Sequence, residues 1–193
     1  MARQKEFDRA DALRRALELF WTRGYDGTSV NDLTLAMGLS RSSLYETFGD
    51  KQELFLEAIT RYIASMDSRR TAVLAGAGPV RDRLARYFAG AVTFLLDPAR
   101  PGGCFFTNTA IALDSMDARV RAAIRKGDAR QEADFRACIE EGQRTGELAR
   151  RDDPRAVARF LVGLLRGLTV LARMHRDRKT LEDVVAVGLG GLG

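Results

Sequence analysis

The chain has 193 residues, of which 46% are hydrophobic and 30% charged, and its formal net charge is +5. This length and composition suit one or two compact units with a sizeable core and exclude a tail or linker. There is no run of eighteen apolar residues and no charged and then apolar leader, so we expect a soluble cytoplasmic protein without a membrane partner. One histidine and two distant cysteines, Cys104 and Cys138, argue against a metal site and a disulfide framework, and we expect no cofactor.

The net charge does not by itself indicate a nucleic-acid partner. Residues 1–51 contain eight Lys or Arg and eight Asp or Glu, so this segment is neutral. Any DNA interface must therefore depend on where individual basic and hydroxyl side chains point.

Apolar residues recur every three or four positions along nearly the whole chain, which predicts an all-α protein. In the first part, Ser29 stands three residues before Asp32, a spacing close to a capping box. Ser40 and Asp50 are suitable N-caps for two further helices. We predict helices over 8–24, 29–38, 41–48 and 51–75.

The rest of the chain also reads as helices separated by clear breaks. Pro79 can begin a helix, and the segment 97–103 is a loop with two prolines and two glycines. The glycine-rich end, 188–193, is expected to fray. We predict a helix beginning at 79, a short helix within 104–114, and helices over about 117–145, 153–174 and 180–189.

The segment 41–48 combines one apolar face with a polar face. Leu44 and Phe48 lie one turn apart on the same face, whereas Ser42 and Glu46 point the opposite way. A helix, a turn with glycine and a polar second helix form the geometry that places a recognition helix in the major groove of DNA. The alternative is an ordinary helical hairpin whose polar face is solvated.

Side chains in and beside this segment suit contacts with DNA. Arg41 can read guanine, the serines can act as small donors or acceptors, and Tyr45 can touch a thymine methyl group or a phosphate. Glu46 would repel phosphate unless it accepts a hydrogen bond from a cytosine amino group. Phosphate contacts are expected at helix starts, where backbone N–H groups favour anions, from Thr28, Ser29 and Lys51.

The segment 24–55 resembles the N-terminal DNA-binding domain of TetR/AcrR-type transcriptional regulators. The shared pattern comprises Gly24 and Tyr25, Thr28 and Ser29, Gly38 to Ser40, Leu44 and Tyr45, Phe48 and Lys51. The resemblance implies that bases are read by Asn31, Arg41, Ser42, Ser43, Tyr45 and Glu46. It implies phosphate contacts from Thr28, Ser29, Thr47 and Lys51. The chain departs from the family at Thr47, where a bulky His or Tyr is common, and at the acidic Glu46.

The resemblance also implies how the whole chain is organised. Residues 1–50 would form a helix-turn-helix DNA-binding domain, and residues 51–193 a larger helical domain for effector binding and dimerisation. The helix predicted over 155–174 is apolar on more than one face, so it must bury both, against its own core or against another copy. The resemblance implies a homodimer, and we assign its interface to Phe160, Leu164, Leu168, Leu171, Leu181 and Val185. Two-fold symmetry would then set the recognition helices about one DNA turn, ~34 Å, apart on a palindromic operator.

A cavity for a small-molecule effector among the middle helices is likewise implied by the resemblance. We nominate an apolar lining with a few polar groups, made of Phe88, Val92, Phe105, Phe106, Thr109, Phe135 and Met174. For each of these residues, ordinary core packing is the alternative. Cys104 follows a Gly pair, and it is either a structural cysteine or a sensor of oxidants or electrophiles.

The function expected from these observations is that of a ligand-responsive repressor, which binds double-stranded DNA as a homodimer and is released by a small-molecule effector. Two alternatives remain open at this point. One is an enzyme or small-molecule carrier, and the other is a protein-interaction module that uses the apolar C-terminal helices. No nucleophile triad, P-loop or dinucleotide fingerprint appears, and one histidine supports little acid–base chemistry, so we do not expect an enzyme.

Overall fold

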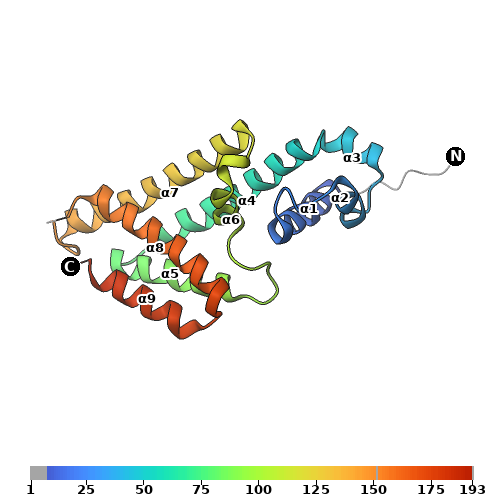
Figure 1. The fold of residues 1–193 in the computed structure, drawn as a ribbon. Helices are drawn as coiled ribbons and strands as arrows, with labels where there is room; N and C mark the ends of the chain where they lie inside the picture. The colour runs from blue at the N-terminus through green and yellow to red at the C-terminus, as the bar shows by residue number, and fades with distance from the viewer. Residues whose placement is uncertain (1–7, 151, 193) are drawn as a thin grey trace.

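The computed structural model describes residues 8–150 and 152–192, and throughout these residues the regular structure is helical (Figure 1). The helices predicted from the periodicity are present, with ends within a few residues of the prediction. They are α1 Arg9–Arg23, α2 Val30–Met37, α3 Arg41–Phe48, α4 Lys51–Leu74, α5 Val80–Leu96, α6 Phe105–Ile111, α7 Ala118–Thr145, α8 Pro154–His175 and α9 Arg178–Gly190, with a 3-10 helix, Leu113–Ser115, between α6 and α7. The predicted all-α class is confirmed.

Helices α1, α2 and α3 form a small core with the first turns of α4. Phe20, Leu33, Leu44 and Phe55 lie at its centre, and at most 1% of each side chain remains exposed. Phe20 meets Phe55 edge to face, with ring centroids 4.9 Å apart, a geometry that aromatic pairs prefer. Because each short helix has one face in this core, its other faces are left to the solvent.

Side-chain caps set the starts of these helices, because they satisfy backbone N–H groups that a helix leaves free at its first turn. The expected capping box of Ser29 and Asp32 is present at α2. A second box, of Asp50 and Glu53, begins α4. Gly38 ends α2 in the left-handed conformation, with φ of 69°, which glycine adopts without strain. The turn between α2 and α3 is thus defined on both sides.

Helix α4 joins the two ends of the molecule. In Figure 1 it runs from the group of α1, α2 and α3 into the bundle formed by α5, α7, α8 and α9. In that bundle it contributes Arg70, whose side chain is 4% exposed. Arg70 forms ion pairs at 2.8 Å with Asp67 of the same helix and with Asp134 of α7. A charge as deeply buried as this one is tolerated only with such partners.

The bundle has its own core, built mainly on α5, α7 and α8. Phe88 of α5 and Phe135 of α7 are fully buried and stack with ring centroids 6.0 Å apart. Leu161 of α8 and Leu181 of α9 are also fully buried and belong to the same cluster. Each of these helices therefore contacts the cluster through the apolar face formed by residues spaced three or four positions apart.

The glycine-rich end of the chain is partly helical. Fraying was expected over 188–193; α9 ends at Gly190, one residue beyond its predicted end, and Gly193 lies outside the described residues. Gly188 is buried, and a Cβ atom added there would lie 2.7 Å from a methyl group of Leu164. This glycine therefore lets α9 pack closely against α8, and the packing holds the last turns of the helix in place.

Candidate nucleic-acid interface and effector cavity

Helix α3 presents a polar surface over two buried anchors. Leu44 is fully buried and Phe48 is 5% exposed, so the predicted apolar face does lie in the core. Arg41, Ser42, Tyr45 and Glu46 are exposed, and Ser43 and Thr47 are half-buried at the margin. Asn31, in the first turn of α2, is exposed as well. The side chains expected to read bases therefore reach the solvent around one short helix.

The start of α3 is organised by three serines. The Ser40 hydroxyl accepts a hydrogen bond from the backbone N–H of Ser43 at 3.1 Å. It also exchanges hydrogen bonds of 2.9 Å with the hydroxyls of Ser42 and Ser43. Since each hydroxyl has one donor and two acceptor positions, Ser42 and Ser43 keep free capacity for a further partner. Their positions are set before any partner arrives.

Two groups expected to contact phosphate lie at helix starts. Lys51 is the first residue of α4, and its ammonium stands 4.1 Å from the centre of the Tyr25 ring, a cation–π contact that limits the freedom of the lysine chain. Ser29 is exposed at the start of α2. Its hydrogen bonds lower the pKa of Asp32, so that carboxylate stays ionised in the capping box.

Thr28 differs from the expectation. Its side chain is fully buried, and its hydroxyl donates a hydrogen bond of 2.7 Å to the carbonyl of Gly24. It therefore holds the turn between α1 and α2 and has no path to a phosphate. Of the neighbouring residues Thr28 and Ser29, the first is buried and the second is exposed. The sequence pattern alone does not show which of the two reaches the solvent.

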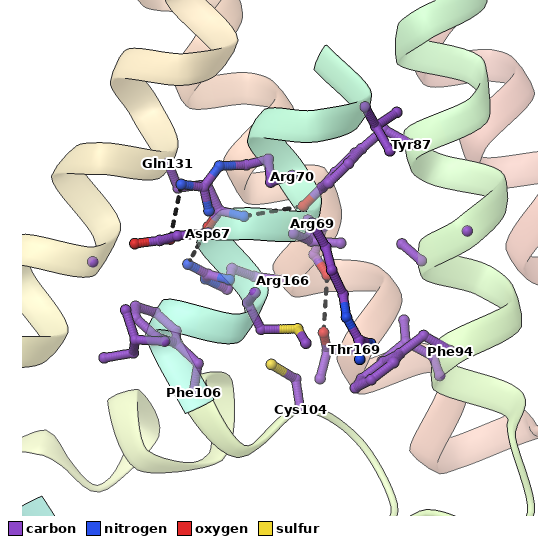
Figure 2. A pocket seen from close by; sticks show the side chains of 18 of the residues that line it. Asp67, Arg69, Arg70, Tyr87, Phe94, Cys104, Phe106, Gln131, Arg166 and Thr169 are labelled. Carbon is purple, nitrogen blue, oxygen red and sulfur yellow. Dashed lines mark hydrogen bonds and ion pairs between the residues drawn. The ribbon is translucent and has the colours of Figure 1, made fainter. Parts of the chain in front are cut away.

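Helices α4, α5, α6, α7 and α8 surround a partly open cavity of about 230 Å³ (Figure 2). Its apolar wall includes Ile63 and Met66 of α4, Phe94 of α5, Phe106 of α6 and Leu165 of α8. Its polar wall includes Arg69, Tyr87, Gln131, Arg166 and Thr169. An apolar space with a few convergent polar groups is the usual form of a small-molecule site.

The polar groups on one side of the cavity bond to one another. Gln131 donates from Nε2 to the Tyr87 hydroxyl at 3.3 Å and accepts from Arg166 at 2.7 Å. The Arg166 guanidinium also pairs with Asp128 at 3.1 Å and lies 4.5 Å from the centre of the Phe106 ring. Burial raises the pKa of Tyr87, so its hydroxyl stays protonated. This chain of contacts links α5, α7, α8 and α6 around the cavity.

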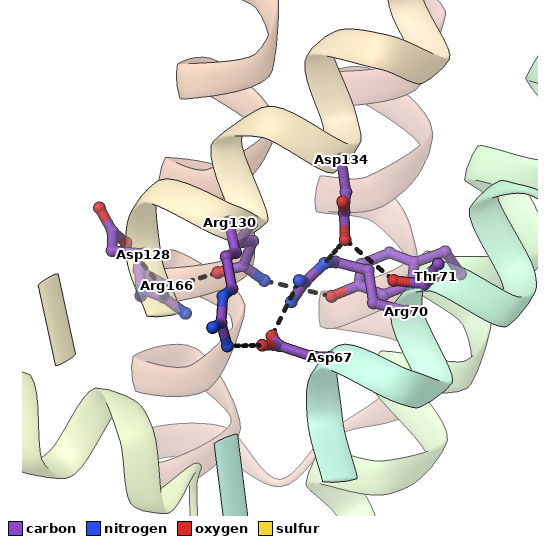
Figure 3. A network of polar contacts seen from close by, with 9 residues as sticks. Asp67, Arg70, Thr71, Asp128, Arg130, Asp134 and Arg166 are labelled. Carbon is purple, nitrogen blue, oxygen red and sulfur yellow. Dashed lines mark hydrogen bonds and ion pairs between the residues drawn. The ribbon is translucent and has the colours of Figure 1, made fainter. Parts of the chain in front are cut away.

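An ion-pair network beside the cavity connects α4 to α7 (Figure 3). Asp67 accepts from Arg70 at 2.8 Å and from Arg130 at 3.3 Å. Asp134 accepts from Arg70 at 2.8 Å and from Thr71 at 3.1 Å. Among the described residues, Asp67 is the one carboxylate in the cavity wall, and it is already paired with two guanidinium groups.

The cavity has a different lining from the one nominated. Of the seven nominated residues, Phe106 alone lies in its wall. Phe88, Val92, Phe135 and Phe105 are buried in the two cores, and Thr109 is buried with its hydroxyl donating to the carbonyl of Phe105. Met174 is 68% exposed on the outside of α8. Periodicity identifies the apolar face of a helix, but it does not say which part of that face meets a cavity and which part meets another side chain.

One residue of the cavity wall had a readable signal in the sequence. On α7, Ile124, Gly127, Gln131 and Phe135 follow one another on the buried stripe, and Gln131 is 6% exposed. An amide on an otherwise apolar face needs buried partners, which points to a polar site inside the protein. Gln131 was not among the predicted residues.

The nominated dimer residues fall into two groups. Leu168 and Leu181 are fully buried within one chain and have no surface to offer. Phe160 is 49% exposed, and Leu164, Leu171 and Val185 are half-buried. The exposed apolar face of α8, here called the α8 stripe, consists of Ala156, Phe160, Gly163, Gly167, Val170 and Met174. A Cβ atom added at Gly163 or Gly167 would meet nothing within 4 Å, so contacts inside the chain do not require either glycine.

An aromatic cluster connects the DNA-binding helices to the cavity wall. Trp21 of α1 stacks on Phe94, with ring centroids 5.9 Å apart, and on Phe105, at 6.4 Å. Tyr62 of α4 meets Trp21 edge to face at 5.2 Å, and its hydroxyl lies 3.3 Å from the sulfur of Cys104. Phe94 and Cys104 both line the cavity. A molecule bound there would therefore contact side chains that themselves contact Trp21 of α1 and Tyr62 of α4.

Other classes of site find no support in the described part of the chain. None of its helices is long and apolar enough to cross a membrane. Nor does it contain a group of three or more His, Cys, Asp or Glu side chains placed to hold a metal ion. Cys138 is buried in the bundle core, where burial raises the pKa of its thiol to about 11.

Comparison with known proteins agrees with this arrangement. Residues 12–58 match the family described as bacterial regulatory proteins, tetR family, and residues 80–187 match the tetracyclin repressor-like C-terminal domain. The chain is 35% identical to the uncharacterized HTH-type transcriptional regulator YezE of Bacillus subtilis over the full length of both. It is 32% identical to the HTH-type transcriptional repressor ComR of Escherichia coli, over 97% of this chain and 90% of ComR. A cysteine mutant of the TetR family regulator CifR, crystallised with 26-bp double-stranded operator DNA, superimposes with a TM-score of 0.88 at 33% identity, covering 99% of this chain and 100% of that one.

Proposed function

Since the chain belongs to the TetR family of DNA-binding transcriptional regulators, which are not enzymes, we propose that it is a repressor whose homodimer binds a palindromic operator and is released by a small-molecule effector. The observation that carries this proposal is the surface of α3. Four exposed polar side chains, Arg41, Ser42, Tyr45 and Glu46, surround a helix whose two apolar residues are buried. Such a helix fits the major groove, where side chains of these types can reach base edges.

The relatives support the DNA-binding and repressor parts of the proposal. CifR, similar over nearly the whole of this chain, was crystallised with double-stranded operator DNA. ComR is named as a repressor. Base contacts are proposed for Arg41, Ser42, Ser43, Tyr45, Glu46 and Asn31, and phosphate contacts for Ser29, Thr47 and Lys51. Ser29 and Lys51 are placed where helix starts favour an anion.

The α8 stripe supports the homodimer. It is apolar along five turns of α8 and exposed in the single chain, whereas the arginines of α8 lie outside it. Its two glycines leave room for a second helix to approach the backbone closely. On α9, Val187 is also apolar and 80% exposed. Two copies joined about a two-fold axis through this surface would present two α3 helices to successive half-sites, about one helical turn of DNA apart.

The aromatic cluster suggests how an effector would act. A ligand in the cavity would contact Phe94 and Cys104, and their neighbours Trp21 and Tyr62 belong to α1 and α4. We propose that the ligand favours a position of this cluster in which the two α3 helices no longer match the half-site spacing. Such a shift requires that the ligand bind the two states with different affinities.

The experiment that tests the proposal is the selection of binding sites by the purified protein from fragmented genomic DNA of its source, at two salt concentrations. Recovery of one palindromic site is expected, with an affinity that falls as salt rises because bound counterions are released from phosphates. Recovery of no preferred sequence at either concentration would count against α3 as a recognition helix. A single half-site without its two-fold mate would count against the homodimer.

A further inference from the structure

The cavity combines an apolar interior with two arginines, Arg69 and Arg86, that have no acidic partner among the described residues. We propose that its ligand is a small organic anion, with a compact apolar body inside the cavity and a carboxylate or similar group at Arg69. The inference rests on the proposed function, because it assigns a chemical class to the effector of the same cavity.

The volume limits the body of the ligand. A cavity of about 150 Å³ lined by apolar side chains is known to hold benzene, and sites for drug-sized molecules start at about 300 Å³. The cavity of about 230 Å³ therefore suits a phenyl ring or a short alkyl chain with a few further atoms. Ile63, Met66, Phe94 and Leu165 give this body apolar contacts on several sides.

Most polar groups of the wall already have partners. Tyr87 and Arg166 each bond to Gln131, and the Thr169 hydroxyl donates to the carbonyl of Leu165 at 3.0 Å. Asp67 is held by Arg70 and Arg130. The inner wall therefore has no strong need for a polar ligand group, and it favours the apolar end of the molecule.

Two guanidinium groups at the cavity lack an acidic partner. Arg69 makes no hydrogen bond or ion pair with any residue that the structure describes, and Figure 2 shows its side chain extending along the cavity. Arg86 donates to the backbone carbonyl of Ala77 at 2.9 Å and has no carboxylate within ion-pair distance among the described residues. The other two arginines of the wall, Arg70 and Arg166, are paired with acids. The charge left over at the cavity is thus positive.

This charge distribution separates the possible ligands. A cationic ligand would need a free carboxylate, and Asp67 would have to leave two arginines to supply one. A neutral ligand would gain the apolar contacts only. An anion would gain those contacts and a charge-assisted hydrogen bond to Arg69. Because Arg69 is exposed, solvent and salt weaken this bond, and we expect an advantage of about fivefold in affinity, equivalent to about 1 kcal/mol.

The test uses three probes that share one apolar body: 4-phenylbutyrate, the neutral 4-phenylbutanamide and the cationic 4-phenylbutylamine. Titration calorimetry with the full-length protein at pH 7 should give the tightest binding for the carboxylate, about fivefold tighter than the amide, and the weakest for the amine. Arg69→Gln should remove the difference between carboxylate and amide while leaving the amide affinity unchanged. Arg125→Gln, which removes one exposed charge from α7 away from the cavity, should preserve the difference.

Equal affinities for the three probes, no binding of any of them, or a preference that survives Arg69→Gln would overturn the assignment. These results are separable from a failure of the proposed function. Site selection measures DNA binding without a ligand, so an intact operator with no probe preference would reject only the anion site. Conversely, a carboxylate preference abolished by Arg69→Gln would stand even if no operator were recovered.

Discussion

Helix α3 and helix α7 are both amphipathic, but they bury their apolar residues in different surroundings. Helix α3 packs on one side only, so each residue that is not an anchor reaches solvent. Helix α7 packs against α4 and α8, and its buried stripe borders a close-packed core in one part and a cavity in another. The side of a residue is thus enough to predict its burial on α3, whereas on α7 the neighbouring elements decide whether a buried residue meets a core or a cavity.

The sharpest test of this contrast lies within α3 itself. Leu44→Ala should lower the free energy of unfolding by about 3 kcal/mol, because it empties a fully buried site. Tyr45→Ala, at the next position, should change it by less than about 0.5 kcal/mol, since Tyr45 is 48% exposed. Urea unfolding of both variants gives the two values. Similar losses at both positions would contradict the separation of anchor and reader, as would an unchanged operator affinity for Tyr45→Ala.

The next test places a charge on the α8 stripe. Gly167→Glu should leave the helical content unchanged, because the position is open in the single chain. In a dimer, the carboxylate would be buried without a partner, and self-association should weaken by about 2 kcal/mol, or ~30-fold. Sedimentation equilibrium measures the effect. Ala129→Glu, on the exposed face of α7, is the matched control and should associate like the parent protein. A dimer of parental strength in Gly167→Glu would place the interface elsewhere.

A smaller effect is expected at the start of α4. Lys51→Ala should weaken operator binding about equally for all sequences and reduce the slope of log affinity against log salt by about 1, because a phosphate contact is lost. Lys126→Ala, an exposed lysine of α7, should leave the slope unchanged. Fluorescence anisotropy with labelled operator at several salt concentrations measures both. A change in sequence preference in place of a change in slope would make Lys51 a reader of bases.

The smallest expected effect is a difference in reactivity between the two cysteines. Cys104 borders the cavity and is half-buried, whereas Cys138 lies in the core with the pKa of its thiol raised to about 11 by burial. Because the thiolate is the reactive form, Cys138 should stay unreactive toward a thiol reagent between pH 7 and 9 in the folded protein. Cys104 should react first, and denaturant should expose the second thiol. Two equal rates in the native protein would show that the bundle core opens as readily as the cavity.

Much of the fold could be predicted because the signals are local. The caps at Ser29 and Asp50 and the apolar repeats define where helices begin and which face is buried, and these depend on residues a few positions apart. The turn before α3 and its two anchors follow from the same rules. Thr28 is the exception, since its inward direction depends on the carbonyl of Gly24 in three dimensions.

The cavity and the dimer surface required contacts between distant segments. Arg69 and Arg70 are neighbours in sequence, yet one is exposed and the other is held by acids on two helices. Leu168 and Leu164 share an apolar helix, but only Leu164 keeps some exposed surface. Such differences arise when elements far apart in the chain meet, and the periodicity of one helix does not contain them.

The position of Trp21 has a practical consequence. It is the single tryptophan of the chain, it is 6% exposed, and its indole nitrogen has no hydrogen-bond partner among the described residues. Its ring stacks on Phe94 at the edge of the cavity while its backbone belongs to α1. Its intrinsic fluorescence therefore reports on the surroundings of Trp21 without an added label. In one cuvette, successive additions of probe and operator would show whether each alters the surroundings of the same indole.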